Sequence, residues 1–403
     1  MDYRINFKRF IKEHFITLIF VVLVLISLIT TNQDGIFVII ENLMNKVMGF
    51  ALITVALIIP INAGMGFNFS IGVGAIAAQF AIIIAVSLQL SGFIGILFTV
   101  ILATILALMF GYITGLLLNN AKGHEMITSL FIGYTANGIY QYVLLFLFGS
   151  KIPVKASELI LSSGTGIRNT IDLKSTLFKS SNGMLEAPAF FLLFVASIGY
   201  LIFLVIKLRS DKSSISISSI LLSPLCLITS GIIMYTNCLP YKMAHLKSLK
   251  LPIISIIIIL ALILCYKFFI EDRITPASVD TNNKRWSSKK LRVTSITLST
   301  ILAAWGQLIF LYNLGILNTY GAHVSISLLG ICALIIGGAT LRHATVKHGI
   351  RGLILIQAFL IITLPQLDGN VSSVLRVIIL NSVYVYVFTK KYYKSTPLEP
   401  NAL

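Results

Sequence analysis

The stretch FIGILFTVILATILALMFGYITGLLL, from Phe93 to Leu118, runs for 26 residues without a charged side chain. A helix needs about 20 such residues to cross the hydrocarbon layer of a bilayer. Because lipid offers no hydrogen-bond partner to the backbone, a run of this kind crosses a membrane as a helix, which satisfies its own amides. The stretch therefore predicts a transmembrane helix.

Similar apolar runs recur along most of the chain. Hydrophobic residues make up 57% of the 403 residues and charged residues only 11%, whereas about 25% of the residues in a soluble domain are charged. We therefore predict an all-α, polytopic membrane protein with about 10–12 transmembrane helices, including broken or re-entrant ones. The predicted helices span Phe15 to Thr31, Val47 to Asn62, Ile71 to Leu90, Phe93 to Leu118, Ile127 to Phe148, Ala189 to Ile206, Ile217 to Asn237, Leu251 to Ile270, Val293 to Leu314, Val324 to Leu341, Gly352 to Leu367 and Val371 to Thr389.

The formal net charge of +17 is distributed between the apolar runs and is not gathered in one tail or face, which argues against a nucleic-acid-binding surface. No A-x-A-like cleavage site follows the first run, so we interpret it as a retained helix and place the N-terminus in the cytoplasm. Alternate loops should then be rich in Lys and Arg. The loops at 207–212, 271–292, 342–351 and after 389 meet this expectation on the cytoplasmic side, whereas Lys242, Lys247 and Lys250 fall outside.

One stretch rich in glycine and asparagine interrupts the apolar pattern, Asn62-Ala-Gly-Met-Gly-Phe-Asn-Phe-Ser-Ile-Gly-Val-Gly-Ala75. Broken backbone is tolerated at membrane depth where it is buried in protein or lines a cavity, so Asn62, Asn68 and Ser70 are candidates for a substrate path. The alternative is that the glycines only let helices approach closely. A weaker echo from Gly321 to Ile326 resembles Gly66 to Ile71 and suggests a distant duplication of the helical core.

Three polar residues near the start of the next predicted helix are further candidates. Glu125 is an acid close to the membrane, and such residues are often functional. An acid at a helix start is also favoured by the helix dipole, which requires no function. Tyr134 and Asn137 could offer hydrogen bonds to a polar solute, and packing in the protein core is the competing interpretation.

The loop from Glu271 to Arg292 reads EDRITPASVDTNNKRWSSKKLR and is long and highly charged for a connection between two helices. It has enough exposed material to bind a soluble partner. A solvated connector on the positive-inside face would look the same.

The order of these features resembles the permease subunits of bacterial ABC importers for simple sugars, nucleosides and branched-chain amino acids, across most of Asn42 to Thr389. The motif G-G-I-D-L-S-V-G of that family is met by Ala63 to Gly72, with Asn68 or no residue at the acidic position. A G-x-x-x-G-x-L helix end matches Gly111 to Leu117, and A-K-x-x-x-N-E-V-I-x-T-L matches Ala121 to Leu130. The Glu-Met-Ile form is closest to the nucleoside and simple-sugar branch.

Two departures from the family stand out. Its cytoplasmic R-A-x-G-x-N-x-x-A-A motif, which contacts the ATPase, is replaced by Val279 to Arg292, which lacks the paired alanines and the glycine. We interpret the span 207–250 as an added or remodelled helical hairpin. By resemblance, the residues that would couple to the ATPase are Asp280, Asn282, Asn283, Lys284, Arg285 and Trp286.

The resemblance implies a single transmembrane permease domain over residues 1–403, with 149–188 as an extracellular loop and 271–292 as a cytoplasmic coupling loop. No G-x-x-x-x-G-K-[ST] phosphate loop occurs in the chain, and we expect neither an enzyme nor a bound cofactor or metal; ATP would be hydrolysed by a partner. The implied partners are a P-loop ATPase subunit, a second permease subunit in a homodimer or a heterodimer, and an extracellular substrate-binding lipoprotein. The implied location is the bacterial cytoplasmic membrane, with both termini in the cytoplasm.

The leading hypothesis is therefore an importer permease for a nucleoside or a simple sugar. A stand-alone secondary transporter that couples to protons through Glu125 is the alternative.

Overall fold

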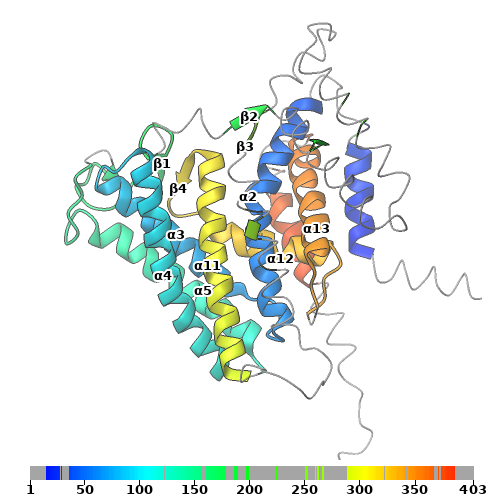
Figure 1. Ribbon diagram of the computed structural model, residues 1–403, viewed down its shortest axis with the longest axis horizontal. Helices are drawn as coiled ribbons and strands as arrows, with labels where there is room; N and C mark the ends of the chain where they lie inside the picture. Colours follow the sequence, from blue (N-terminus) through cyan, green and yellow to red (C-terminus); the bar gives the residue numbers. More distant parts are fainter. Residues whose placement is uncertain are drawn as a thin grey trace, which may run out of the picture.

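The computed structural model of the chain is mostly helical (Figure 1). It describes residues 15–27, 29, 36–121, 123–156, 159–177, 186–188, 197–198, 224, 228, 250–252, 259, 261–262, 266, 288–321, 323–341, 343–366, 371 and 374–385. Among these residues, six helices are long and apolar enough to cross a membrane, by length and composition. The prediction of a polytopic, all-α membrane fold is confirmed at this level, and the total of about 10–12 helices stays a prediction.

The helices overlap their predicted spans, although the bounds of α2, α12 and α13 differ. In chain order they are α2 (Ile36–Asn62), the 3₁₀ turn η2 (Phe69–Ile71), α3 (Gly72–Ser87), α4 (Gly92–Asn120), α5 (Glu125–Tyr142) with its π-helical extension η3 (Val143–Leu147), α11 (Ser288–Leu314), α12 (Val324–Ile336), and α13 (Val346–Ala358), which continues through η7 (Phe359–Thr363) and η8 (Leu364–Gln366). Shorter apolar helices cover Phe15–Ser27 and Val374–Val385.

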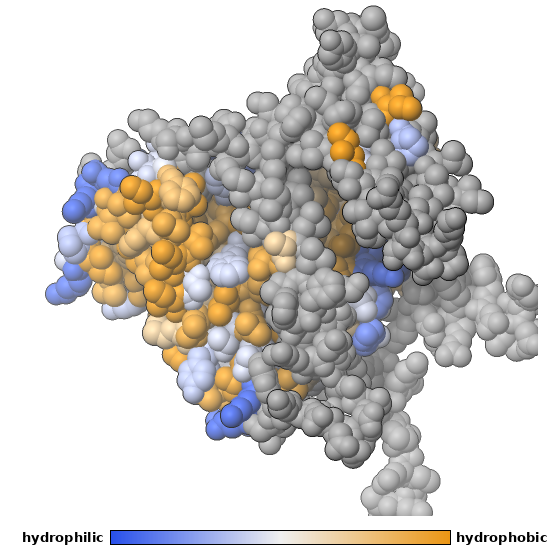
Figure 2. Space-filling view, in the orientation of Figure 1, coloured by the Kyte–Doolittle hydropathy of each residue, from blue (hydrophilic) through white to orange (hydrophobic). Residues whose placement is uncertain are grey.

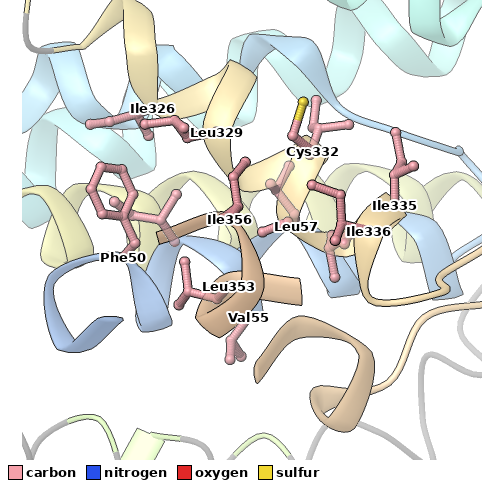
Figure 3. Close-up of a cluster of buried hydrophobic side chains, with 14 of the residues drawn as sticks. Phe50, Val55, Leu57, Ile326, Leu329, Cys332, Ile335, Ile336, Leu353 and Ile356 are labelled. Carbon is pink, nitrogen blue, oxygen red and sulfur yellow. The ribbon is translucent and has the colours of Figure 1, made fainter. Parts of the chain in front are cut away.

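Helix α11 joins the two groups of helices in the described structure. It packs against α3 and α4 on one side and against α2 on the other (Figure 1). On the α2 side, the largest apolar cluster fills the space between α2, α12 and α13 (Figure 3). Its members include Phe50, Val55 and Leu57 of α2, Ile326, Leu329, Cys332, Ile335 and Ile336 of α12, and Leu353 and Ile356 of α13.

Glycines set how closely these helices approach. A methyl group on Gly111 of α4 would lie about 3 Å from Thr297 and Thr300 of α11, and one on Gly115 would lie 3.0 Å from Val293. On α3, a methyl group on Gly74 would overlap α11 at the Thr300 carbonyl oxygen. The close-packing interpretation of the 62–75 stretch therefore holds for Gly74.

Contacts between loops show which of them lie on the same side of the membrane. Strand β1 (Thr170–Asp172), from the predicted extracellular loop, pairs with β4 (Ile316–Asn318), and β2 (Glu186–Pro188) pairs with β3 (Lys250–Pro252). Both pairs join segments that the charge pattern places outside. Lys250, which runs against the positive-inside rule, thus lies on the same side as residues 186–188.

The outer wall on the α4 side is apolar between two polar ends. In Figure 2, hydrophilic residues gather near β1 at one end and near the start of α11 at the other, and the visible surface between them is mainly hydrophobic. Along α4 the exposed residues include Phe93, Leu97, Ile101, Ile105 and Leu108. Such a face suits contact with lipid tails.

Candidate functional site

Asn62 ends α2 and ties it to the loop before α13. Its Nδ2 donates to the Ala344 carbonyl at 3.0 Å and to the Tyr266 hydroxyl at 3.1 Å, and its Oδ1 accepts from the Ala344 amide at 3.0 Å. The side chain is buried, as is Ala344. Asn62 thus joins two segments that the charge pattern places on the cytoplasmic side, and three of its hydrogen-bonding positions are occupied by protein.

We expect Asn62→Leu to lower the free energy of unfolding by about 2 kcal/mol, because it leaves the buried backbone of Ala344 without partners. Thermal denaturation of the detergent-purified chain measures the effect. Ser382→Ala serves as the control, since the Ser382 hydroxyl is exposed and its bond within the described part of the chain is to Ile378 of its own helix. An equal Tm for the Asn62→Leu variant and the native chain would contradict this role.

The predicted interruption follows directly after Asn62. Gly64 and Gly66 have positive φ values of 79° and 74°, which favour glycine, and the chain runs without helix from there to η2. Asn68 caps η2, with its Oδ1 accepting from the Ser70 amide at 3.1 Å and from the Ser70 hydroxyl. The prediction of a broken helix is confirmed, and the first two glycines make the break whereas Gly74 packs against α11.

The break lies against α5. The Phe69 amide donates to the Ser129 hydroxyl at 3.0 Å, and a methyl group on Gly133 would lie 3.3 Å from the Phe69 carbonyl oxygen. Asn68 and Ser70 are both buried. Asn68 Nδ2 is buried and has no acceptor among the residues that the structure describes. A buried amide donor of this kind is costly unless water or a solute oxygen reaches it.

The echo segment lies beside the break. A methyl group on Gly72 would meet the Ser327 hydroxyl at 3.1 Å and the His323 carbonyl oxygen at 3.5 Å. The echo segment thus leads from β4 into α12 and lies against the start of α3. The origin of the two segments by duplication stays a prediction.

A buried polar cluster surrounds His323 next to this contact. Gln79 of α3, Tyr140 of α5, Gln307 of α11 and His323 before α12 are at most 2% exposed. The Tyr140 hydroxyl donates to the Thr319 carbonyl at 2.9 Å, and the Tyr140 and His323 rings meet edge to face at 4.8 Å between centroids. The cluster joins helices from both ends of the chain.

The orientation of the Gln79 amide is assigned from its partners. If its nitrogen faced the His323 amide at 3.2 Å and Gln307 Nε2 at 3.1 Å, it would meet only donors. Reversed, its oxygen accepts from both of these groups, and its nitrogen donates to His323 Nδ1 at 3.1 Å and to the Tyr140 hydroxyl at 2.7 Å. His323 Nδ1 is then an acceptor, so the neutral ring carries its proton on Nε2, which lies 2.6 Å from Asn137 Oδ1.

Helix α5 is the least covered of the long apolar helices. Only 11% of its most apolar part is buried, and Tyr134 is 65% exposed. Thr135, Gly138 and Tyr142 are exposed on the same helix, and Asn137 is partly exposed. Packing in the core of this chain is therefore excluded for Tyr134.

Glu125 forms an ion pair with Arg292. The two side chains are each 14% exposed and connect the start of α5 to the first turns of α11. Arg292 is also the last residue of the predicted coupling loop. The candidate acid is thus attached to the point where that loop enters the membrane.

Two sets of candidates stand apart from these contacts. The coupling residues Asp280, Asn282, Asn283, Lys284, Arg285 and Trp286 lie outside the described residues, as does most of the predicted hairpin at 207–250. The sequence reasoning did not find Gln79, Tyr140, Gln307 or Arg292 as members of the site, and it noted His323 only within the echo. Gln79 and Gln307 are isolated amides within apolar runs, which was the available signal.

Comparison of the chain with models of known protein families, with curated proteins and with solved structures gave no match.

Proposed function

We propose that this chain is the membrane-spanning subunit of an ABC importer, which takes up a nucleoside or a simple sugar with energy from a separate ATPase subunit. It would lie in the bacterial cytoplasmic membrane with both termini in the cytoplasm. The observation that carries the proposal is the contrast between α4 and α5. Both are largely uncovered. The exposed residues of α4 are apolar apart from Tyr112 and the terminal Asn120. Those of α5 include Tyr134 and Thr135 beside apolar residues such as Phe131 and Ile139.

Polar groups on a lipid-facing helix are costly, so they usually face protein or water. The face of α5 with Tyr134, Thr135, Asn137 and Gly138 therefore fits the wall of a conduit that is closed by a second permease subunit. Without the second subunit, this face of α5 is uncovered. Tyrosine and amide groups suit a neutral, hydroxylated solute, because they bind by hydrogen bonds and by stacking.

The energy source in this proposal lies at the cytoplasmic end. ATP binding to the partner would move the loop 271–292. This movement would be transmitted through Arg292 to Glu125 and so to α5. The buried break at Asn68 and Ser70 lies against the same helix and would move with it. An extracellular binding lipoprotein would deliver the solute, as in the resembling family.

A proton-coupled mechanism needs an acid that can exchange its proton during transport. Glu125 is already paired with Arg292. No observation among the described residues favours the secondary transporter over the importer.

The test of the function is ATP-dependent uptake. The tagged chain, purified from its own cells, should bring with it a protein carrying a G-x-x-x-x-G-K-[ST] motif. Proteoliposomes with both proteins should accumulate radiolabelled uridine or ribose, delivered with the binding protein encoded nearby, only when ATP reaches the ATPase. Active uptake by the chain alone, driven by a proton gradient, would refute the proposal.

A variant of the loop tests its role in coupling. Replacing Asn282, Asn283 and Trp286 with alanine is expected to lower ATP-driven uptake at least tenfold, which corresponds to about 1.4 kcal/mol of lost coupling. Retention of the ATPase during purification is measured in parallel. Lys151→Gln, an exposed change away from this loop, serves as the control. Unchanged association and uptake in the triple variant would remove the loop from the mechanism.

A further inference from the structure

The polar cluster around His323 is connected to the uncovered face of α5 through one residue. Asn137 Oδ1 accepts from His323 Nε2 at 2.6 Å and from Gln141 Nε2 at 3.2 Å. Its Nδ2 has no hydrogen-bond acceptor in the part of the chain that the structure describes. Asn137 therefore lies between a buried cluster and the exposed face that carries Tyr134.

These side chains form a series of hydrogen bonds, in which the direction of each bond is determined by the previous bond. Gln307 donates to Gln79, which donates to His323 Nδ1, and the ring then donates from Nε2 to Asn137 Oδ1. With its oxygen occupied by two donors, the Asn137 amide cannot reverse without losing both bonds. The only free hydrogen-bonding group that it offers to the exposed face is its NH₂.

We propose that His323 is a positioning residue that holds Asn137 as a hydrogen-bond donor toward the transport path, so that this point of the path binds solutes through an acceptor oxygen. The inference rests on the proposed function. It names the chemistry of one contact in the path: a hydroxyl or carbonyl oxygen of a neutral solute, accepting from Asn137 Nδ2.

The burial of the cluster supports this role over simple filling of space. Four polar side chains from α3, α5, α11 and the segment before α12 are placed inside an apolar bundle, where unpaired groups would be costly. Gln307 Oε1 has no partner among the described residues, but the hydrogen bonds to Gln79 fix the His323 ring in one orientation, and a fixed ring is what a fixed donor direction requires. Tyr140 and Thr319 complete the pairing around Gln79 and leave Asn137 as the member that reaches the surface.

The first arm of the test does not depend on transport. The full chain with ¹⁵N-labelled histidine, reconstituted in nanodiscs, is studied by NMR, and His323→Gln assigns the signal. We expect a neutral ring protonated at Nε2 between about pH 5 and pH 8. A ring protonated at Nδ1, or a charged imidazolium in this range, would overturn the proposal even if uptake is normal.

The second arm uses uptake of uridine and ribose by the complete, ATP-driven complex. Asn137→Asp removes the donor and keeps the acceptor for His323, and is expected to raise KM by about threefold to tenfold with little change in kcat. His323→Leu should raise KM similarly, and His323→Gln, which retains a donor to Asn137, should restore it. Asn381→Asp is the control, because the Asn381 amide is exposed and, among the described residues, donates only to Val377 of its own helix.

The two failures are distinguishable. If the native complex shows no ATP-driven uptake, the proposed function fails, and the tautomer is still read by NMR. If uptake is normal and Asn137→Asp and His323→Leu keep the native KM, the positioning role is wrong while the importer proposal stands.

Discussion

Gly352→Ala is expected to destabilise the chain by about 3 kcal/mol or more, the upper end of the usual cost of overpacking. Gly352 lies where α13 crosses the end of α12. A methyl group there would overlap the Ala333 carbonyl oxygen and lie 2.6 Å from the Gly337 backbone nitrogen. Backbone atoms cannot move aside as a flexible side chain can, so the two helices must separate and open the cluster shown in Figure 3.

The measurement is thermal denaturation in detergent, with a Tm at least about 5 °C below that of the native chain. Gly138→Ala is the matched control. Gly138 is also a helical glycine in a membrane-spanning segment, but an added methyl group meets nothing within 4 Å. Since alanine favours helix over glycine, this control should leave Tm unchanged or raise it. Equal stability of Gly352→Ala and Gly138→Ala would show that α12 and α13 are not in this close contact.

Breaking the Glu125–Arg292 pair from one side is the second large expected effect. Glu125→Gln leaves the Arg292 guanidinium only 14% exposed and without its counter-charge, and Arg292→Gln does the same to Glu125. Each single change is expected to cost about 1.5–3 kcal/mol, because the pair is partly buried and the charge left behind keeps some contact with water. The double variant, with no charge at either position, should be more stable than the sum of the two single effects predicts.

The double-mutant cycle also separates a structural pair from a proton carrier. If the pair transmits movement from the loop to α5, both single variants lose ATP-driven uptake and the double variant regains part of its stability. A proton carrier would give a different result, with uptake lost in Glu125→Gln and retained in Arg292→Gln. Additive stability effects in the cycle would mean that the two charges do not interact.

The membrane helices were predictable because long apolar runs are unambiguous. The predicted starts at Ile71 and Phe93 lie one residue from the observed starts of α3 and α4. The start of α2 was predicted at Val47, which is wrong by 11 residues, since the helix begins at Ile36. The extra turns contain the polar residues Glu41, Asn42, Asn45 and Lys46. Polar residues are tolerated in the end of a helix that leaves the hydrocarbon layer.

Errors at the C-terminal helices have the same type of cause. Helix α12 ends at Ile336 and not at Leu341, because Gly338 takes a left-handed φ of 95°. Helix α13 begins at Val346 and not at Gly352, with the polar Lys347, His348 and Arg351 in its first turns. An amphipathic helix start has the hydropathy of a loop, so composition alone does not find it.

The candidate site was predictable only where one segment carried the signal by itself. The glycines and asparagines of 62–75 indicated the break, and Asn137 on α5 was named as a candidate from the sequence. Its partner His323 is 186 residues away along the chain, and Gln79 is 244 residues from His323. No local pattern connects residues at such separations.

The sequence by itself determined that lipid surrounds the protein, where the helices lie and where the break between α2 and α3 falls. Apolar runs and glycines have this effect because they act through local hydrogen bonding and burial in lipid. The tertiary structure decided which polar groups pair: Asn62 with Ala344, Glu125 with Arg292, and His323 with Gln79 and Asn137. Pairing depends on how α3, α5 and α11 cross, and that geometry is set by packing between distant segments.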